Sequence, residues 1–184
     1  MGPWSPLCAF LLIFFIHGTC SQKCLCARGF CERGWVQYQN TCYKAVKEKM
    51  TWTDAEMACQ SYGRNSHLAS IHSTEENDFI FHLMDKPTDY TKGQAYWIGA
   101  HDTFKEGIFV WTDGSRFDFR TFSPPQPDGL PGENYLASWF LLNGFVTWND
   151  YVVSWKFMSV CKYYLESSCC VSQGPCKADM KSST

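Results

Sequence analysis

The sequence predicts one domain that combines two helices with several short strands. Segments 51–62 and 73–84 contain capping-box spacing and repeat apolar residues at helical intervals. Segments 96–99 and 108–111 are short apolar runs typical of buried strands. Hydrophobic residues make up 45% of the 184 residues and aromatic residues 17%, so a sizeable core can be buried. The net charge of −2 and the lack of a basic stripe give no basis for a nucleic-acid partner, and none is expected.

The N-terminus is typical of a secretory signal peptide, which we predict over residues 1–20. This stretch contains no Asp, Glu, Lys or Arg, and an apolar run over Leu7–Ile16 is followed by the small residues Gly18–Ser21. The alternative, a membrane anchor, needs ~20 apolar residues, more than this run provides. We therefore expect a secreted, extracellular protein with no membrane insertion.

Eleven cysteines indicate a disulfide-containing chain in an oxidising compartment. Loss of Cys8 and Cys20 with the signal peptide leaves nine, so one thiol stays free or joins another chain. Metal binding by Cys24-Leu25-Cys26 or Cys169-Cys170 lacks the usual ligand spacing and histidine partners. Disulfides are the better interpretation.

The domain is predicted to open with a hairpin around the turn pair Gln39-Asn40, which would bring Cys31 near Cys42, and we pair these two. The first helix is predicted from the capping-box spacing of Thr53 and Glu56, and it ends at Gly63. Its expected buried face is Trp52, Ala55, Cys59 and Tyr62. The second helix starts with Ser73 and Glu76 at the same spacing and ends before Pro87, with a buried face of Phe79, Ile80, Leu83 and Met84.

The other strands are expected at 67–71, 96–99, 108–111, 145–148 and 157–161. Asp113-Gly114 is a predicted turn. Between Ser115 and Gly144 the sequence has little regular period, and prolines and glycines are concentrated in 124–131. A loop of this length in a compact domain is usually functional. Trp97, Trp111 and Trp148 are expected in the core.

Five oxygen-bearing side chains in and beyond this loop form a candidate metal site: Gln126, Asp128, Glu133, Asn149 and Asp150. Three carboxylates and two amides suit Ca²⁺, whereas Zn²⁺ prefers His or Cys. A cis bond before Pro127 would turn the side chains of Gln126 and Asp128 toward the same side. The loop therefore predicts a calcium site that gathers residues from both of its ends.

The order of several motifs resembles the C-type lectin-like domain family over Cys31 to Tyr164. The motifs are Cys31-x-x-Gly34-Trp35, Trp52-x-Asp54-Ala55-Glu56-x-x-Cys59, His67-Leu68-Ala69-Ser70-Ile71, Trp97-Ile98-Gly99, Trp111-Thr112-Asp113-Gly114, Gln126-Pro127-Asp128, Trp148-Asn149-Asp150 and Val160-Cys161. The chain is most similar to short secreted lectins of fish and venoms. The resemblance implies an α+β fold, in which two helices flank small antiparallel sheets and a long loop carries a Ca²⁺-dependent sugar site. It also implies the disulfides Cys31–Cys42 and Cys59–Cys161.

Within that family, Gln-Pro-Asp accompanies galactose-type sugars, so the resemblance implies a lectin for galactose-type glycans. Gln126 and Asp128 would form one amide–acid pair for the sugar, Asn149 and Glu133 the second pair, and Asp150 would be an ion ligand. No enzymatic activity is expected, because carboxylates on an ion stay ionised and Ser70 and Ser73 lack a nucleophile motif.

Two departures from the family pattern leave an alternative open. Tyr135 and Val153 stand where the family usually has a loop disulfide, and the loop 129–132 lacks the aromatic residue on which galactose stacks. Tyr135 or Trp139 are the candidate replacements. The alternative is a lectin-like domain that binds a protein, a mineral or an ice surface without sugar recognition.

The remaining cysteines lie in two short extensions, 21–30 and 165–184, around a lectin-like domain at 31–164. They are Cys24, Cys26, Cys169, Cys170 and Cys176. Because the family fold brings its chain ends together, two bridges between these extensions are expected. The fifth cysteine would then join two chains in a disulfide-linked homodimer.

Overall fold

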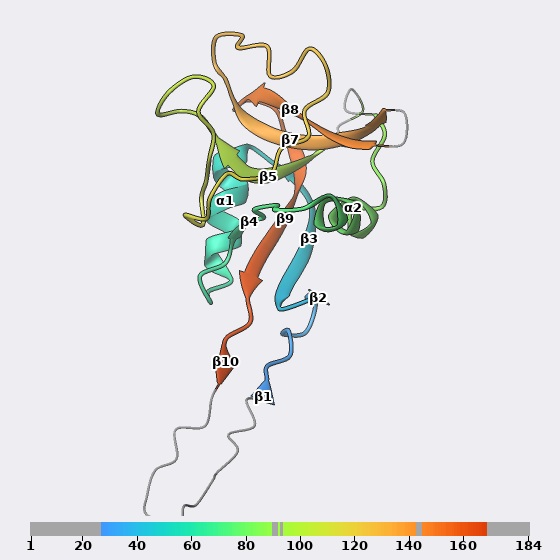
Figure 1. Ribbon diagram of the computed structural model, residues 1–184, viewed down its shortest axis with the longest axis vertical. Helices are drawn as coiled ribbons and strands as arrows, with labels where there is room; N and C mark the ends of the chain where they lie inside the picture. Colours follow the sequence, from blue (N-terminus) through green and yellow to red (C-terminus); the bar gives the residue numbers. More distant parts are fainter. Residues whose placement is uncertain (1–26, 90–91, 93, 143–144, 169–184) are drawn as a thin grey trace, which may run out of the picture. The chain divides into compact units, whose positions relative to one another are not determined.

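The computed structural model describes residues 27–89, 92, 94–142 and 145–168 (Figure 1). The predicted signal peptide and the cysteines of both predicted extensions lie outside these residues. Within the described part of the chain, no helix is long and apolar enough to cross a membrane. Strands β1 (Ala27–Arg28) and β10 (Ser167–Ser168) form a two-stranded sheet of their own.

The domain is built on one eight-stranded sheet with the strand order β2-β3-β9-β5-β7-β8, to which β4 and β6 add through β9 and β5. The strands of its main path are β2 (Val36–Tyr38), β3 (Thr41–Met50), β5 (Tyr96–His101), β7 (Glu133–Leu142), β8 (Phe145–Val152) and β9 (Phe157–Tyr164). The short strands are β4 (His67–Leu68) and β6 (Val110–Trp111), and the helices are α1 (Trp52–Ser61) and α2 (Thr74–Leu83). The named strands of this sheet pair in antiparallel fashion, except β5 and β9, which are parallel. The predicted α+β class is confirmed.

The two helices lie on opposite sides of β3 and β9 (Figure 1). Successive strand residues point to opposite faces, so neighbouring residues of one strand can pack in different clusters of the core. Val160 packs in the cluster that contains Ile80 of α2, whereas its neighbour Cys161 packs in the cluster of α1. The disulfide between Cys59 and Cys161 then ties α1 to β9, and Cys31 is bonded to Cys42. Both disulfides agree with the pairing that the resemblance implies.

The first helix starts differently from its prediction. Thr51, not Thr53, is the N-cap: its hydroxyl accepts from the Asp54 amide at 3.3 Å and donates to the Asp54 carboxylate at 2.7 Å. Glu56 is buried instead, and its carboxylate accepts from the Leu68 amide at 2.8 Å and contacts His67. The spacing that resembled a capping box therefore reflects a tertiary contact between α1 and β4. The start of the second helix agrees with its prediction, since Ser73 caps it through the Glu76 amide. Its most buried aromatic residue is Phe81, whereas Phe79 is only partly buried.

The predicted irregular stretch from Ser115 to Gly144 is wrong in its second half. β7 begins at Glu133 and pairs with β8 from Glu133↔Val152 to Leu142↔Phe145, so the irregular segment is confined to the chain between β6 and β7. That segment returns to β8 where the Ser123 amide donates to the Trp148 carbonyl at 3.1 Å and the Trp148 amide donates to Thr121 at 2.7 Å. Trp148, like Trp97, is fully buried, as expected. Its position brings the Gln-Pro-Asp segment to the edge of β8.

Candidate metal centre

Three of the five predicted residues meet as a compact group of carboxylates. One carboxylate oxygen from each of Asp128, Glu133 and Asp150 lies within 4.8 Å of the others. Asp128 comes from the segment before β7, Glu133 begins β7, and Asp150 lies in β8. Oxygens on opposite sides of a Ca²⁺ ion are ~5 Å apart, because each Ca–O bond measures 2.3–2.6 Å. The observed spacing therefore suits such an ion.

The oxygens of Asp150 are buried, and no other described residue donates a hydrogen bond to them. Asp150 is 0% exposed, and both of its carboxylate oxygens lack a hydrogen-bond partner in the described part of the chain. Burial raises the pKa of Asp150 to about 6. The backbone amide of Asp150 opposes this shift, and the negative charges of Asp128, Glu133 and Asp102 reinforce it. The pKa of Glu133 is also raised, first by burial and then by Asp128. A buried carboxylate among like charges is favourable when a cation shares the site.

The Gln126–Asp128 segment presents an amide and a carboxylate side by side. The Gln126–Pro127 peptide is cis, the geometry that would turn the side chains of Gln126 and Asp128 toward the same side. The Gln126 side-chain amide donates to Asp128 Oδ2 at 3.0 Å, while its carbonyl oxygen accepts from the Asp128 backbone amide at 3.0 Å. Asp128 Oδ1 accepts from the Leu130 amide at 3.2 Å. Both side chains are thus held at the edge of the cluster.

Gln126 and Asn149 complete the predicted set at a cavity of about 440 Å³, which Asp128 and Glu133 also line. The Asn149 side-chain oxygen is buried and, within the described residues, has no hydrogen-bond donor. It offers a further oxygen of the kind that a hard cation prefers. All five residues predicted from the sequence therefore lie at the cluster or at the adjoining cavity.

An aromatic wall of the same cavity was missed at the sequence level. Tyr151 and Trp155 line the cavity beside Gln126 and Asn149, and Trp155 is 38% exposed. The Trp155 ring lies nearly parallel to Phe157, with centroids 5.5 Å apart and an interplanar angle of 21°. A short chain segment after β8 with an isolated tryptophan was the only available signal. Of the predicted replacements, Tyr135 packs on Trp52 instead, with centroids 4.7 Å apart, and the Trp139 side chain lies outside the description.

The start of β7 is braced by a second buried carboxylate. Asp102 is 1% exposed, and it accepts from the Asn134 side-chain amide at 3.0 Å and from the Gly107 amide at 2.8 Å. The Asp102 amide donates to the Asn134 carbonyl at 3.1 Å. Because Asn134 follows Glu133, these bonds position the Glu133 carboxylate at the cluster.

Ser70, His72 and Asp118 form a chain that resembles a nucleophile–base–acid series. Ser70 Oγ lies 3.2 Å from His72 Nε2, and His72 Nδ1 lies 2.8 Å from Asp118 Oδ1. Ser70 is nevertheless 0% exposed, and its hydroxyl donates to Asp113 and accepts from Lys162 at 3.1 Å. No reagent reaches this hydroxyl, so the arrangement is a structural hydrogen-bond network.

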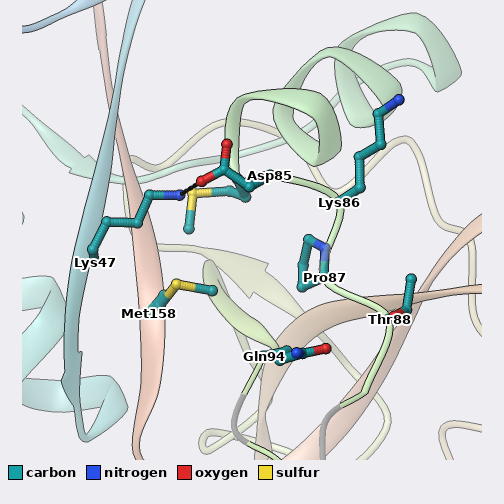
Figure 2. Close-up of a pocket in the computed structure, with 8 residues that line it drawn as sticks. Lys47, Asp85, Lys86, Pro87, Thr88, Gln94 and Met158 are labelled. Atoms are coloured by element: carbon teal, nitrogen blue, oxygen red, sulfur yellow. Dashed lines mark hydrogen bonds and ion pairs between the residues drawn. The ribbon is translucent and has the colours of Figure 1, made fainter.

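A different cavity, of about 300 Å³, lies at the C-terminal end of α2 (Figure 2). It is lined by none of the five predicted residues. Lys47 is directed toward Asp85, and their charged atoms are 2.7 Å apart, while Lys86 points away from Met158 and Gln94 (Figure 2). Its charges are thus paired or directed outward, and it does not contribute to the candidate metal centre.

Comparisons with known proteins cover the segment that carries the cluster. Residues 48–163 match the family described as the lectin C-type domain. A relative from Pseudechis australis, named a C-type lectin galactose-binding isoform, is 34% identical over 160 residues, which are 85% of this chain and 95% of the relative. The solved structure of the C-type lectin CEL-I from Cucumaria echinata aligns with a TM-score of 0.66 and 29% identity, over 76% of this chain and all of that one. A calcium-independent type II antifreeze protein aligns with a TM-score of 0.64 and 28% identity, over 76% and 98% of the two chains.

Proposed function

The chain belongs to the lectin C-type domain family, and from that premise we propose that it is a secreted, calcium-dependent lectin for galactose-type glycans that catalyses no reaction. The observation that carries the proposal is the cluster of Asp128, Glu133 and Asp150. No other described residue donates a hydrogen bond to the Asp150 carboxylate. Family members generally bind Ca²⁺, and the all-oxygen donor set of this chain fits that ion.

The proposed ion site uses Gln126, Asp128, Glu133, Asn149 and Asp150. Bound Ca²⁺ would supply a positive centre that accepts lone pairs from two neighbouring sugar hydroxyls. Asp128 and Glu133 would each accept a hydrogen bond from one of these hydroxyls. Gln126 and Asn149 would each donate one through the side-chain amide. The hydrogen and both lone pairs of each hydroxyl would then be engaged. A sugar whose hydroxyls point in other directions would leave some of these interactions unmade, and the site could discriminate against it.

We further propose that Trp155 supplies the apolar surface that the short loop after Asp128 lacks. It lines the cavity that contains all four proposed sugar-binding residues, and its ring is supported by Phe157. One face of galactose carries mostly C–H groups, and such a face packs well on an aromatic ring. A contact of this kind would favour galactose over sugars that present hydroxyls on that face.

The galactose assignment draws on the order Gln126-Pro127-Asp128 and on the relative from Pseudechis australis, whose name states galactose binding. The alternative, a surface-binding domain without sugar recognition, draws on the structural similarity to a calcium-independent antifreeze protein. That similarity concerns the scaffold. The acid–amide pairs around the carboxylate cluster favour the lectin.

The test is retention on immobilised galactose in calcium, followed by elution with a chelator. Glu133→Gln should abolish both retention and calcium binding by calorimetry. Glu48→Gln, which makes the same change on the exposed part of β3, should leave both intact. Retention that persists in the chelator would reject a calcium-dependent sugar site.

The segments at the two ends of the chain also receive proposed roles. We propose that residues 1–20 are removed as a signal peptide, that 31–164 form the lectin domain, and that the cysteines in 21–30 and 165–184 include one that links two chains. Non-reducing electrophoresis of the secreted protein should show a dimer that reducing agent dissociates. Two linked sites would gain avidity for clustered glycans.

A further inference from the structure

A smaller cavity adjoins the Gln126–Asp128 segment. Its volume is about 300 Å³, and its lining includes Ile108, Phe109, Phe117, Arg120, Phe122 and Pro127. Gln126 and Asp128, on either side of Pro127, line the cavity of the candidate metal centre. The two cavities therefore share this segment as a common wall, and a ligand in one would lie close to the other.

The floor of this cavity is a fixed aromatic surface. Phe109 is only 7% exposed, and its ring stacks on Phe117 with centroids 5.7 Å apart and an interplanar angle of 28°. Phe122 contacts the same ring at a centroid distance of 5.6 Å. Because the rings are already held by one another, a ligand would find this apolar surface formed in advance, at a low cost in side-chain ordering.

Arg120 adds an available cation to this apolar surface. It is exposed, and no hydrogen bond or ion pair involves its guanidinium within the described residues. Asp118, the nearest acid along the chain, is engaged by His72 at 2.8 Å. A guanidinium presents a planar fork of donors that matches the oxygens of a sulfate or carboxylate.

We propose that this cavity is a subsite for an acidic substituent, either a sulfate ester or a carboxylate, on a glycan bound at the neighbouring site. Arg120 would pair with the acidic group, and Phe109, Phe117 and Phe122 would contact the carbon atoms that carry it. The proposal rests on the proposed function, because the neutral part of the glycan must be held at the metal centre. It goes further by defining which galactose-type glycans are preferred.

The experiment compares three immobilised ligands in the presence of calcium: a neutral galactoside, the same galactoside with a sulfate ester, and the same galactoside with a carboxylate-bearing sugar attached. We expect at least one acidic ligand to bind about fivefold more tightly than the neutral one. This factor corresponds to the upper end of the free energies that exposed ion pairs usually contribute. Arg120→Ala should remove that preference and leave neutral binding unchanged.

Arg116→Ala is the matched control. Arg116 is exposed in the same segment but does not line the cavity, so its loss changes the net charge equally. Arg116→Ala should keep the preference for the acidic ligand. Equal losses in the two variants, or no acidic preference in the parent protein that binds the neutral galactoside, would overturn the subsite. Failure to bind the neutral galactoside would instead reject the proposed function.

Discussion

The replacement Asp150→Asn should stabilise the protein without calcium and destabilise it relative to the parent protein with calcium. Asp150 is fully buried, and burial raises the pKa of its carboxyl group from its ordinary value of 3.8 to about 6. Each pKa unit corresponds to ~1.4 kcal/mol of differential interaction. At pH 7 the ionised carboxylate therefore costs the calcium-free native state on the order of 3 kcal/mol.

The sign of the pH dependence follows from this raised pKa. Below about pH 4 the carboxyl group is protonated in both the native and the unfolded chain, and the contribution to stability is fully present. As pH rises through about 6, the native state must give up a proton that it holds more tightly than the unfolded chain, so the free energy of unfolding falls. Glu133 acts in the same direction, whereas Asp118, whose pKa is lowered by His72, acts oppositely. Only the difference between parent and variant isolates Asp150.

The assay is thermal unfolding in a chelator between about pH 4 and pH 7, repeated in excess calcium. Without calcium at pH 7, Asp150→Asn should raise Tm by on the order of 6–12 °C, because the expected gain is ~3 kcal/mol and ~1 kcal/mol shifts Tm by 2–4 °C in a chain of this size. With calcium, the parent protein should gain stability and the variant should not. Glu48→Gln serves as the control on β3. A variant with the same pH profile as the parent, or one less stable than it in chelator at every pH, would refute the reasoning.

Three further outcomes are expected. Trp155→Ala should weaken galactoside binding by about tenfold and leave calcium affinity unchanged, whereas Phe104→Ala, at another exposed aromatic residue, should affect neither. Equal sugar binding by the parent protein and Trp155→Ala would contradict the proposed contact between the sugar and Trp155. Thr51→Ala should destabilise the domain by ~1 kcal/mol in chemical denaturation and Thr53→Ala by much less, because Thr51 caps α1; the reverse order would be inconsistent with the observed cap. Lys162→Met should lower the free energy of unfolding by ~3–5 kcal/mol at neutral pH, because it leaves Glu76 buried without its ion-pair partner at 2.7 Å. A decrease below ~1 kcal/mol would show that other groups stabilise the Glu76 carboxylate.

Local signals in the sequence were sufficient for several parts of the fold. Ser73 and Glu76 predicted the start of α2, because an N-cap and its partner lie within one turn. The pairing of Cys31 with Cys42 followed from a short hairpin. The same reasoning failed at Thr53 and Glu56, because the Glu56 carboxylate contacts His67 and accepts a hydrogen bond from the Leu68 amide instead. It failed again at the start of β7, whose pairing with β8 depends on a strand farther along the chain.

The donor chemistry of the candidate metal centre was determined by the sequence alone. Carboxylate and amide side chains on both sides of the loop define the kind of ion that suits them, whatever their exact positions. Only the tertiary structure decided that Asp128, Glu133 and Asp150 share one cluster, that Asp150 is buried there, and that Trp155 lines the adjoining cavity. The physical reason is that burial and proximity depend on how β7, β8 and the preceding segment pack together, and residue identity does not encode those distances locally.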